Sequence, residues 1–153
     1  AAEVIELETG LQCAEFAGHM GGLETAKFLA DLGHEYNDAC LAVERNNHGH
    51  GVLWLLQSLC HYPRIYEQNS QMGWLTNSLT RPAGIGHLNA ALIDRPDQFM
   101  SRRLLAECRS FVRLPDGSTG AQVGAHDDLV MAMAIGLTVR AELLEKGQGA
   151  FRS

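Results

Sequence analysis

The sequence predicts an α/β fold in which helices flank a mixed sheet, and three observations support this prediction. Segments with the two-residue period of strands alternate along the chain with segments of helical period. A short and wholly apolar run, 39–43, has the composition of a central strand covered on both faces. The 153 residues, of which 46% are hydrophobic and 20% charged, suffice for one globular domain with a core.

The first part of the chain predicts a hairpin followed by a helix. Segments 2–7 and 11–18 read as two strands joined by a tight turn at Thr9 and Gly10. Segment 21–37 has helical spacing, and its small and apolar residues share one face. That face consists of Leu23, Ala26, Ala30 and Gly33.

The middle of the chain predicts the central strand, another helix and a further strand. After the strand 39–43, segment 51–59 repeats apolar residues at the spacing of a helix that is packed on one side. These residues are Val52, Leu55, Leu56 and Leu59. Segment 64–68 follows as a plausible strand.

The last part predicts three helices and a second hairpin. One helix covers 82–93, with a proline near its first turn, and Ser101 caps a short helix that runs through Cys108. Segment 110–124 reads as a hairpin that turns at Pro-Asp-Gly. A long helix then runs from about His126 to Lys146 and ends near a glycine.

Composition limits the partners and the compartment. The formal net charge of −6 argues against a surface that coats nucleic acid broadly, although it leaves room for a local basic groove. Segment 1–10 is acidic and no apolar run reaches the length of a membrane span, so neither a signal peptide nor an anchor is expected. The cysteines form no CxxC pair, which predicts reduced core residues. They are Cys13, Cys40, Cys60 and Cys108.

Glu44 is the first candidate for chemistry. It follows the predicted strand 39–43, and the carboxyl ends of strands are where α/β folds gather ligands. Arg45, Asn46 and Asn47 come next and can orient Glu44 or a ligand. A simple pairing of Glu44 with a surface base is an equally good interpretation of this motif alone.

Asp127 and Asp128 open a helix that is otherwise almost wholly apolar. One aspartate in a first turn is explained by free N–H groups and the helix dipole. Two neighbours differ in direction by roughly 100°, and the apolar residues that follow each of them predict that both turn toward protein. Two like charges held close raise each other's pKa unless a cation neutralises them. Hard oxygen ligands of this kind suit Mg²⁺ or Mn²⁺.

Other polar and aromatic residues carry weaker signals. His48 and His50 lack a third nearby ligand and are expected to be loop residues, some of them near phosphate, while the adjacent glycines allow a close backbone approach. Trp54 and Trp74 are expected to pack, although Trp74 in a polar loop could stack on a base. Three arginines could contact phosphates, with a solvated face as the default interpretation. They are Arg81, Arg102 and Arg103.

Four segments, in this order and at this spacing, resemble the nuclease domain of phage terminase large subunits. They read LAVERNNHG at 41–49, TNSLTRPAGIGHLNAAL at 76–92, LLAECRSFV at 104–112 and GAHDDLVMAMAIG at 124–136. The resemblance extends over nearly the whole chain. The ordered set is specific, above all the segment with the glutamate and the His-Asp-Asp helix.

The resemblance implies a ribonuclease H-like fold and a two-metal endonuclease that cuts concatemeric double-stranded DNA during genome packaging. Two Mg²⁺ or Mn²⁺ ions, about 3.5–4 Å apart, would activate water and stabilise the leaving oxygen. The family uses three acids, of which Glu44 matches the second and Asp127 the third. Asp128 would adjust charge or bind metal. The residues expected to contact DNA are Arg45, Asn46, His48 and Arg81.

The resemblance also implies partners and a missing segment. An ATPase domain, a portal and a small terminase subunit would act with the domain in the cytoplasm of a bacterial host, encoded by a phage or prophage. Residues 1–153 match a nuclease domain that lacks the acidic part of its first strand and the ATPase motor. Glu3, Glu6 and Glu8 are not expected to replace the missing aspartate.

Two other functions fit the same carboxylates. A phosphatase-like enzyme on a mixed sheet would hydrolyse small phosphoesters. A truncated prophage remnant would keep the fold and its protein contacts without activity. We expect Asp127→Asn to weaken metal binding more than Asp128→Asn.

Overall fold

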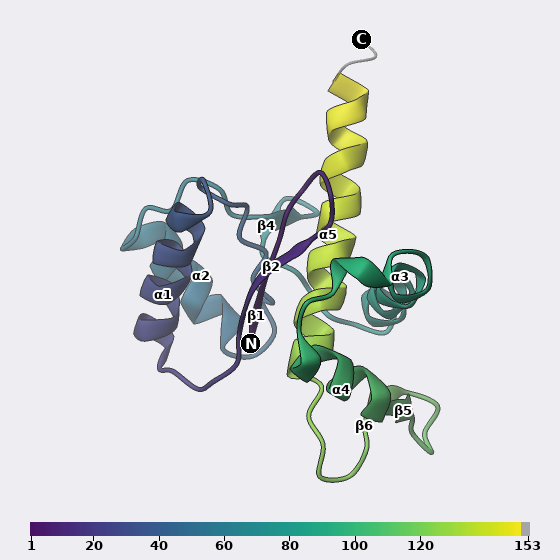
Figure 1. The fold of residues 1–153 in the computed structure, drawn as a ribbon. Helices are drawn as coiled ribbons and strands as arrows, with labels where there is room; N and C mark the ends of the chain where they lie inside the picture. Colours follow the sequence, from purple (N-terminus) through teal and green to yellow (C-terminus); the bar gives the residue numbers. More distant parts are fainter. Residues whose placement is uncertain (151–153) are drawn as a thin grey trace. The chain divides into compact units, whose positions relative to one another are not determined.

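The computed structural model describes the backbone of residues 1–150 and the side chains of residues 1–111 and 114–147. The chain divides into two compact units, each described by itself. One unit combines Ala1–Gly18 with Pro82–Ser153, and the other is His19–Arg81. Figure 1 traces the chain through both. None of the helices in the described residues is long and apolar enough to cross a membrane.

Five α-helices and three small sheets make up the described part of the chain, so the predicted α/β class is confirmed. The helices are α1 (Gly22–Glu35), α2 (Gly49–Ser58), α3 (Thr80–Asp94), α4 (Arg102–Ser110) and α5 (Asp128–Ala150), with a short 3₁₀ helix at Pro96–Gln98. The strands are β1 (Ala2–Ile5), β2 (Gln12–Phe16), β3 (Glu67–Gln68), β4 (Gln71–Met72), β5 (Phe111–Arg113) and β6 (Thr119–Ala121).

The described strands form three separate two-stranded antiparallel sheets, where the sequence predicted one mixed sheet. Parallel pairing occurs as isolated bridges, from Leu41 to Ile65 and from Glu44 to Trp74. The predicted strand 39–43 is half-buried along its length and is not covered on both faces. The parallel pairing is interrupted because the chain leaves this segment after Tyr66 for the β3–β4 turn, where Asn69 and Ser70 have positive φ angles, and pairs with it again only at Trp74.

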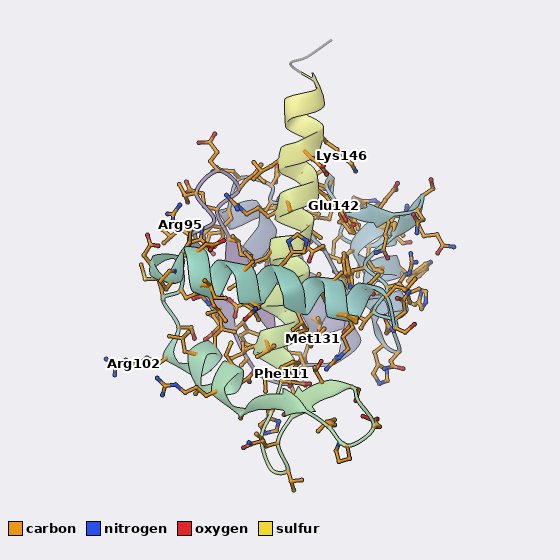
Figure 2. All side chains as sticks on the ribbon, turned by 90° about the vertical axis from the view of Figure 1, so that its right-hand side faces the viewer. Arg95, Arg102, Phe111, Met131, Glu142 and Lys146 are labelled. Carbon is orange, nitrogen blue, oxygen red and sulfur yellow. The ribbon has the colours of Figure 1, made fainter. Side chains whose placement is uncertain are left out.

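The core of the first unit forms around the N-terminal half of α5. Gly84 brings α3 close to α5, because a Cβ there would lie 3.5 Å from the Cβ of Ala134. Figure 2 shows α3 lying across α5, with the turns that carry Glu142 and Lys146 extending past it. The buried residues of this core are Leu88, Phe99, Leu104, Leu129, Val130, Met133, Ala134 and Leu137.

The β1–β2 hairpin is attached to the same unit by its turn. Arg140 of α5 donates from Nε to the carbonyl of Leu7 at 2.7 Å and from Nη2 to the carbonyl of Glu8 at 2.8 Å. Gln98 donates to the carbonyl of Thr9 at 3.1 Å. Gly10, with φ +78°, closes the turn as predicted. The long side chains of two distant elements therefore bind the turn's carbonyls.

In the second unit, α1 and α2 pack around a smaller core. Its buried residues are Ala26, Ala30, Val52, Leu56 and Tyr62. The Tyr62 hydroxyl donates to the carbonyl of Ala39 at 2.6 Å. A Cβ on Gly33 would lie 2.1 Å from that hydroxyl, so the glycine makes room for the tyrosine. The predicted face of α1 is confirmed at three positions, whereas Leu23 is exposed.

The remaining predicted elements agree with the structure within a few residues. Both predicted hairpins form, the second with its turn at 115–117, and each predicted helix is present. Ser101 caps α4, its hydroxyl accepting from the N–H of Leu104. The start of α5 lies two residues after the predicted one. The predicted strand 64–68 shrinks to a bridge at Ile65 and the two residues of β3.

The predicted burial of other residues was partly wrong. The four cysteines are free, but Cys13 is exposed and the other three are half-buried. Trp74 is 3% exposed, which agrees with packing and rules out stacking on a base in this conformation. Trp54 and Leu59 project from α2 and are 62% and 52% exposed, because the buried side of that helix runs through Leu53.

Replacing Gly33 by alanine is expected to destabilise the protein by about 1–3 kcal/mol, because the new methyl group overlaps the Tyr62 hydroxyl. Urea unfolding followed by circular dichroism measures this. Gly51→Ala in α2 is the matched control, since nothing lies within 4 Å of its Cβ position. The control should be neutral or stabilising by up to about 1 kcal/mol. Equal effects of both substitutions would contradict the packing argument.

Candidate functional site

Glu44 ends the segment that follows α1, and backbone hydrogen bonds fix its position. The N–H of Trp74 donates to the carbonyl of Val43, and the N–H of Arg45 donates to the carbonyl of Trp74, both at 2.8 Å. Side chains alternate along such a segment. Val43 packs against the core and Arg45 is buried, so Glu44 points the other way and its side chain is exposed.

Thr76 holds the Glu44 carboxylate. Its hydroxyl donates to Oε1 of Glu44 in a short hydrogen bond. Thr76 is itself fixed by Asn46, whose Nδ2 donates to the Thr76 carbonyl and whose Oδ1 accepts from the Thr76 N–H, both at 2.9 Å. This clamp orients one oxygen of Glu44 from a segment 32 residues later in the chain. Thr76 opens the segment 76–92 that carries part of the resemblance, but its place in an irregular stretch did not connect it to Glu44.

The start of α2 lies directly against the backbone of Glu44. A Cβ on Gly49 would lie 1.7 Å from the Glu44 carbonyl oxygen, which no other residue type could tolerate. The predicted close backbone approach beside His50 is therefore present at Gly49. Gly51, on the other side of His50, has open space around it.

The four residues expected to contact DNA differ in accessibility. Arg45 is 6% exposed, and its Nη1 has no hydrogen-bond partner among the described residues. Asn46 is half-buried and uses its amide on Thr76. His48 is exposed at the N-cap of α2, and Arg81 is half-buried in the first turn of α3. His48 is therefore the most accessible of the four and Arg45 the least.

Asp127 occupies the N-cap position of α5, because its carbonyl accepts from the N–H of Met131 at 3.0 Å. Its side chain is half-buried, and Oδ2 lies 3.8 Å from where a Cβ on Gly120 of β6 would stand. Asp128 is exposed, so the prediction that both aspartates turn toward protein was wrong for Asp128.

The difference follows from the helix surface below each aspartate. The line through Asp127 continues into Val130 and Ala134, which are 1% and 0% exposed. The line through Asp128 runs first over the half-buried Met131 and Ala132 and reaches a buried residue only at Ile135, two turns on. Asp127 is therefore the more enclosed of the two carboxylates.

Glu107 of α4 caps the N-terminus of α5 from another helix. Its Oε2 accepts from the N–H of Leu129 at 2.9 Å and from the N–H of Val130 at 3.2 Å. Both residues are almost fully buried, so water cannot replace these bonds. Glu107 thereby takes the capping role expected of a first-turn aspartate. The sequence placed Glu107 on a short helix but could not connect it to N–H groups more than 20 residues away.

The candidate acids belong to different units. Glu44 lies in the unit His19–Arg81, and Asp127 and Asp128 lie in the other. Within the described residues, no three or more histidine, cysteine, aspartate or glutamate side chains form a group that could hold a metal ion.

No family model and no curated protein matches the chain.

Glu107→Ala is expected to lower the free energy of unfolding by about 1–3 kcal/mol, because two buried N–H groups lose their acceptor. Glu107→Gln keeps an acceptor oxygen and should cost less. Urea unfolding of the three proteins measures the order. Hydrogen exchange at Leu129 and Val130 should accelerate in the alanine variant, and unchanged exchange there would refute the capping role.

Proposed function

We propose that the chain is a metal-dependent endonuclease domain that cuts double-stranded DNA, the activity that the resemblance to terminase nuclease domains implies. The observation that supports this best is the state of Glu44, whose exposed carboxylate is oriented by a dedicated hydroxyl at the end of a fixed segment. A carboxylate that is only part of a solvent-exposed surface needs no hydrogen bond to hold it in one orientation.

The donor chemistry suits Mg²⁺ or Mn²⁺. Glu44 and Asp127 offer hard oxygen atoms, and these ions are bound by few carboxylates and keep water ligands. Glu44 and Asp127 are the residues that would hold two such ions, with Asp128 as an additional acid near the second. When bound, the ions would supply charge neutralisation and a water of lowered pKa.

The residues around Glu44 have separate tasks in this proposal. Thr76 donates to Oε1, so Oε2 would be the oxygen that binds a cation, and Asn46 holds Thr76 in place. In the other unit, Glu107 accepts from the N–H groups of Leu129 and Val130 at the start of α5, next to Asp127 in the chain. Binding geometry is thus prepared before a cation arrives, which lowers the cost of ordering its ligands.

Contact with DNA would involve His48 and Arg81 ahead of Arg45, because Arg45 is buried. Asn46 would act by holding Thr76 in place and would not contact a phosphate. By the same resemblance, the domain would act beside an ATPase domain, a portal and a small terminase subunit in the cytoplasm of a bacterial host. Concatemeric phage DNA would be its substrate.

The decisive experiment titrates Mn²⁺ by calorimetry into the chain and into Glu44→Ala, with nicking of supercoiled plasmid measured in parallel. Saturable binding that the substitution abolishes, together with nicking, supports the proposal. Hydrolysis of p-nitrophenyl phosphate without nicking would identify a small-phosphoester hydrolase. Absence of both binding and activity would identify a remnant that keeps its fold alone.

Asp127→Asn should weaken Mn²⁺ binding more than Asp128→Asn, because Asp127 is half-buried and Asp128 is exposed. We expect a loss of roughly 10-fold or more for Asp127→Asn and less than about 3-fold for Asp128→Asn. Calorimetry at constant ionic strength measures both. An equal or reversed order would show that the exposed aspartate is the principal ligand.

Thr76→Val should weaken Mn²⁺ binding by roughly 10-fold, since valine keeps the shape of threonine but cannot donate to Glu44. Thr76→Ser, which retains the hydroxyl, is the matched control and should bind nearly as the parent does. Thermal melts establish that both variants are folded. If the valine variant binds Mn²⁺ as tightly as the serine variant, Thr76 does not position Glu44.

A further inference from the structure

A polar network joins the β1–β2 hairpin to the start of α4. Glu3 of β1 stands opposite Glu15 of β2 in the strand register, so the two side chains lie side by side on one face of the hairpin. Two ionised carboxylates directly opposite each other repel. The pair therefore needs either a cation between its members or a proton on one of them.

The buried Gln12 determines which oxygen of Glu3 could carry a proton. Its Oε1 accepts from the N–H groups of Met100 at 2.8 Å and Ser101 at 3.0 Å, so its amide nitrogen must face Glu3. That nitrogen donates to Oε2 of Glu3 at 2.7 Å. Oε2 of Glu3 is thus an acceptor, which leaves Oε1 as the position for a proton.

In each of the two carboxyl groups, the other oxygen lacks a hydrogen-bond donor. Oε1 of Glu3 and Oε1 of Glu15 are both buried, and neither receives a hydrogen bond from a described donor. Buried acceptors of this kind are costly when left unsatisfied. One proton between the two carboxyls would satisfy both oxygens at once.

The surrounding charges assign the ionised state to Glu15. Arg103 of α4 donates to Oε2 of Glu15 from Nε at 3.0 Å and from Nη2 at 2.8 Å, and the Glu15 side chain is 10% exposed. Burial raises the pKa of Glu15, but hydrogen bonds from Ser101 and Arg103 outweigh it and lower that pKa below its usual value. Burial, reinforced by Glu15 and opposed by Gln12 and by the Arg103 charge, raises the pKa of Glu3 to about 8.

We propose that Glu3 and Glu15 share one proton, and that this proton fastens the β1–β2 hairpin to the N-terminus of α4. Its loss places a second negative charge in the buried pair, where the Arg103 guanidinium already serves Glu15. The hairpin then loosens from α4. Because α4 also carries Glu107, one turn beyond Arg103, the loosening reaches the cap of α5.

The direction of the pH dependence follows from the two carboxyls. The contribution of Glu3 to stability is fully present below its ordinary pKa of 4.5 and is lost as pH rises through about 8. The contribution of Glu15 is present above 4.5 and is lost as pH falls through its lowered pKa. Together they favour the folded state most near pH 4.5 and least above pH 8.

The test combines a carboxyl ¹³C NMR titration of the parent chain with thermal melts of the parent, Glu3→Gln and Glu8→Gln. Glutamine imitates the protonated acid, and Glu8 is an exposed acid in the turn of the same hairpin. We expect the Glu3 signal to titrate near pH 8. Between pH 5 and 8.5 the Tm of Glu3→Gln should rise, relative to the parent and to Glu8→Gln, by roughly 5 °C.

A Glu3 carboxyl that titrates below about pH 6 would overturn the proposal, as would a Tm of Glu3→Gln that follows the parent at every pH. If Glu3→Gln does not fold, the titration of the parent decides alone. Neither readout depends on Mn²⁺ or DNA, so the outcome is independent of the nuclease proposal.

Discussion

The capping of α5 by Glu107 is the interaction on which the first unit depends. A helix that is apolar from its first turn buries N–H groups that have no partner within the helix. Glu107 supplies the acceptor for two of them, and it does so from α4, so the helix cannot keep its buried start without that neighbour. Asp127 stands at the N-cap of the same helix, where its carbonyl accepts from the N–H of Met131.

Within each unit, polar side chains join elements whose relative positions would not be determined by apolar packing alone. Arg140 and Gln98 hold the turn of the first hairpin, and Gln12 holds its strands to the start of α4. In the second unit, Asn46 and Thr76 join two irregular segments around Glu44. Short strands with half-buried surfaces need such bonds, because a two-stranded hairpin is at best marginally stable by itself.

The sequence predicted the helices and hairpins well because their signals are local. The face of α1 follows from residue spacing, the cap of α4 from one serine, and the turn of the second hairpin from Pro115-Asp116-Gly117. The predicted mixed sheet failed for the opposite reason. Strand pairing depends on the path of a distant segment, and the turn after β3 redirects that path in a way that the run 39–43 does not encode.

The sequence by itself determined the element types, the acids that could carry chemistry and the resemblance that suggests their use. Only the tertiary structure decided that Asp127 is half-buried while Asp128 is exposed, that Thr76 orients Glu44, and that Glu107 caps α5. The physical reason is distance along the chain. A hydrogen bond between residues 20 or more positions apart leaves no periodic pattern, and it exists only once packing has brought its two ends together.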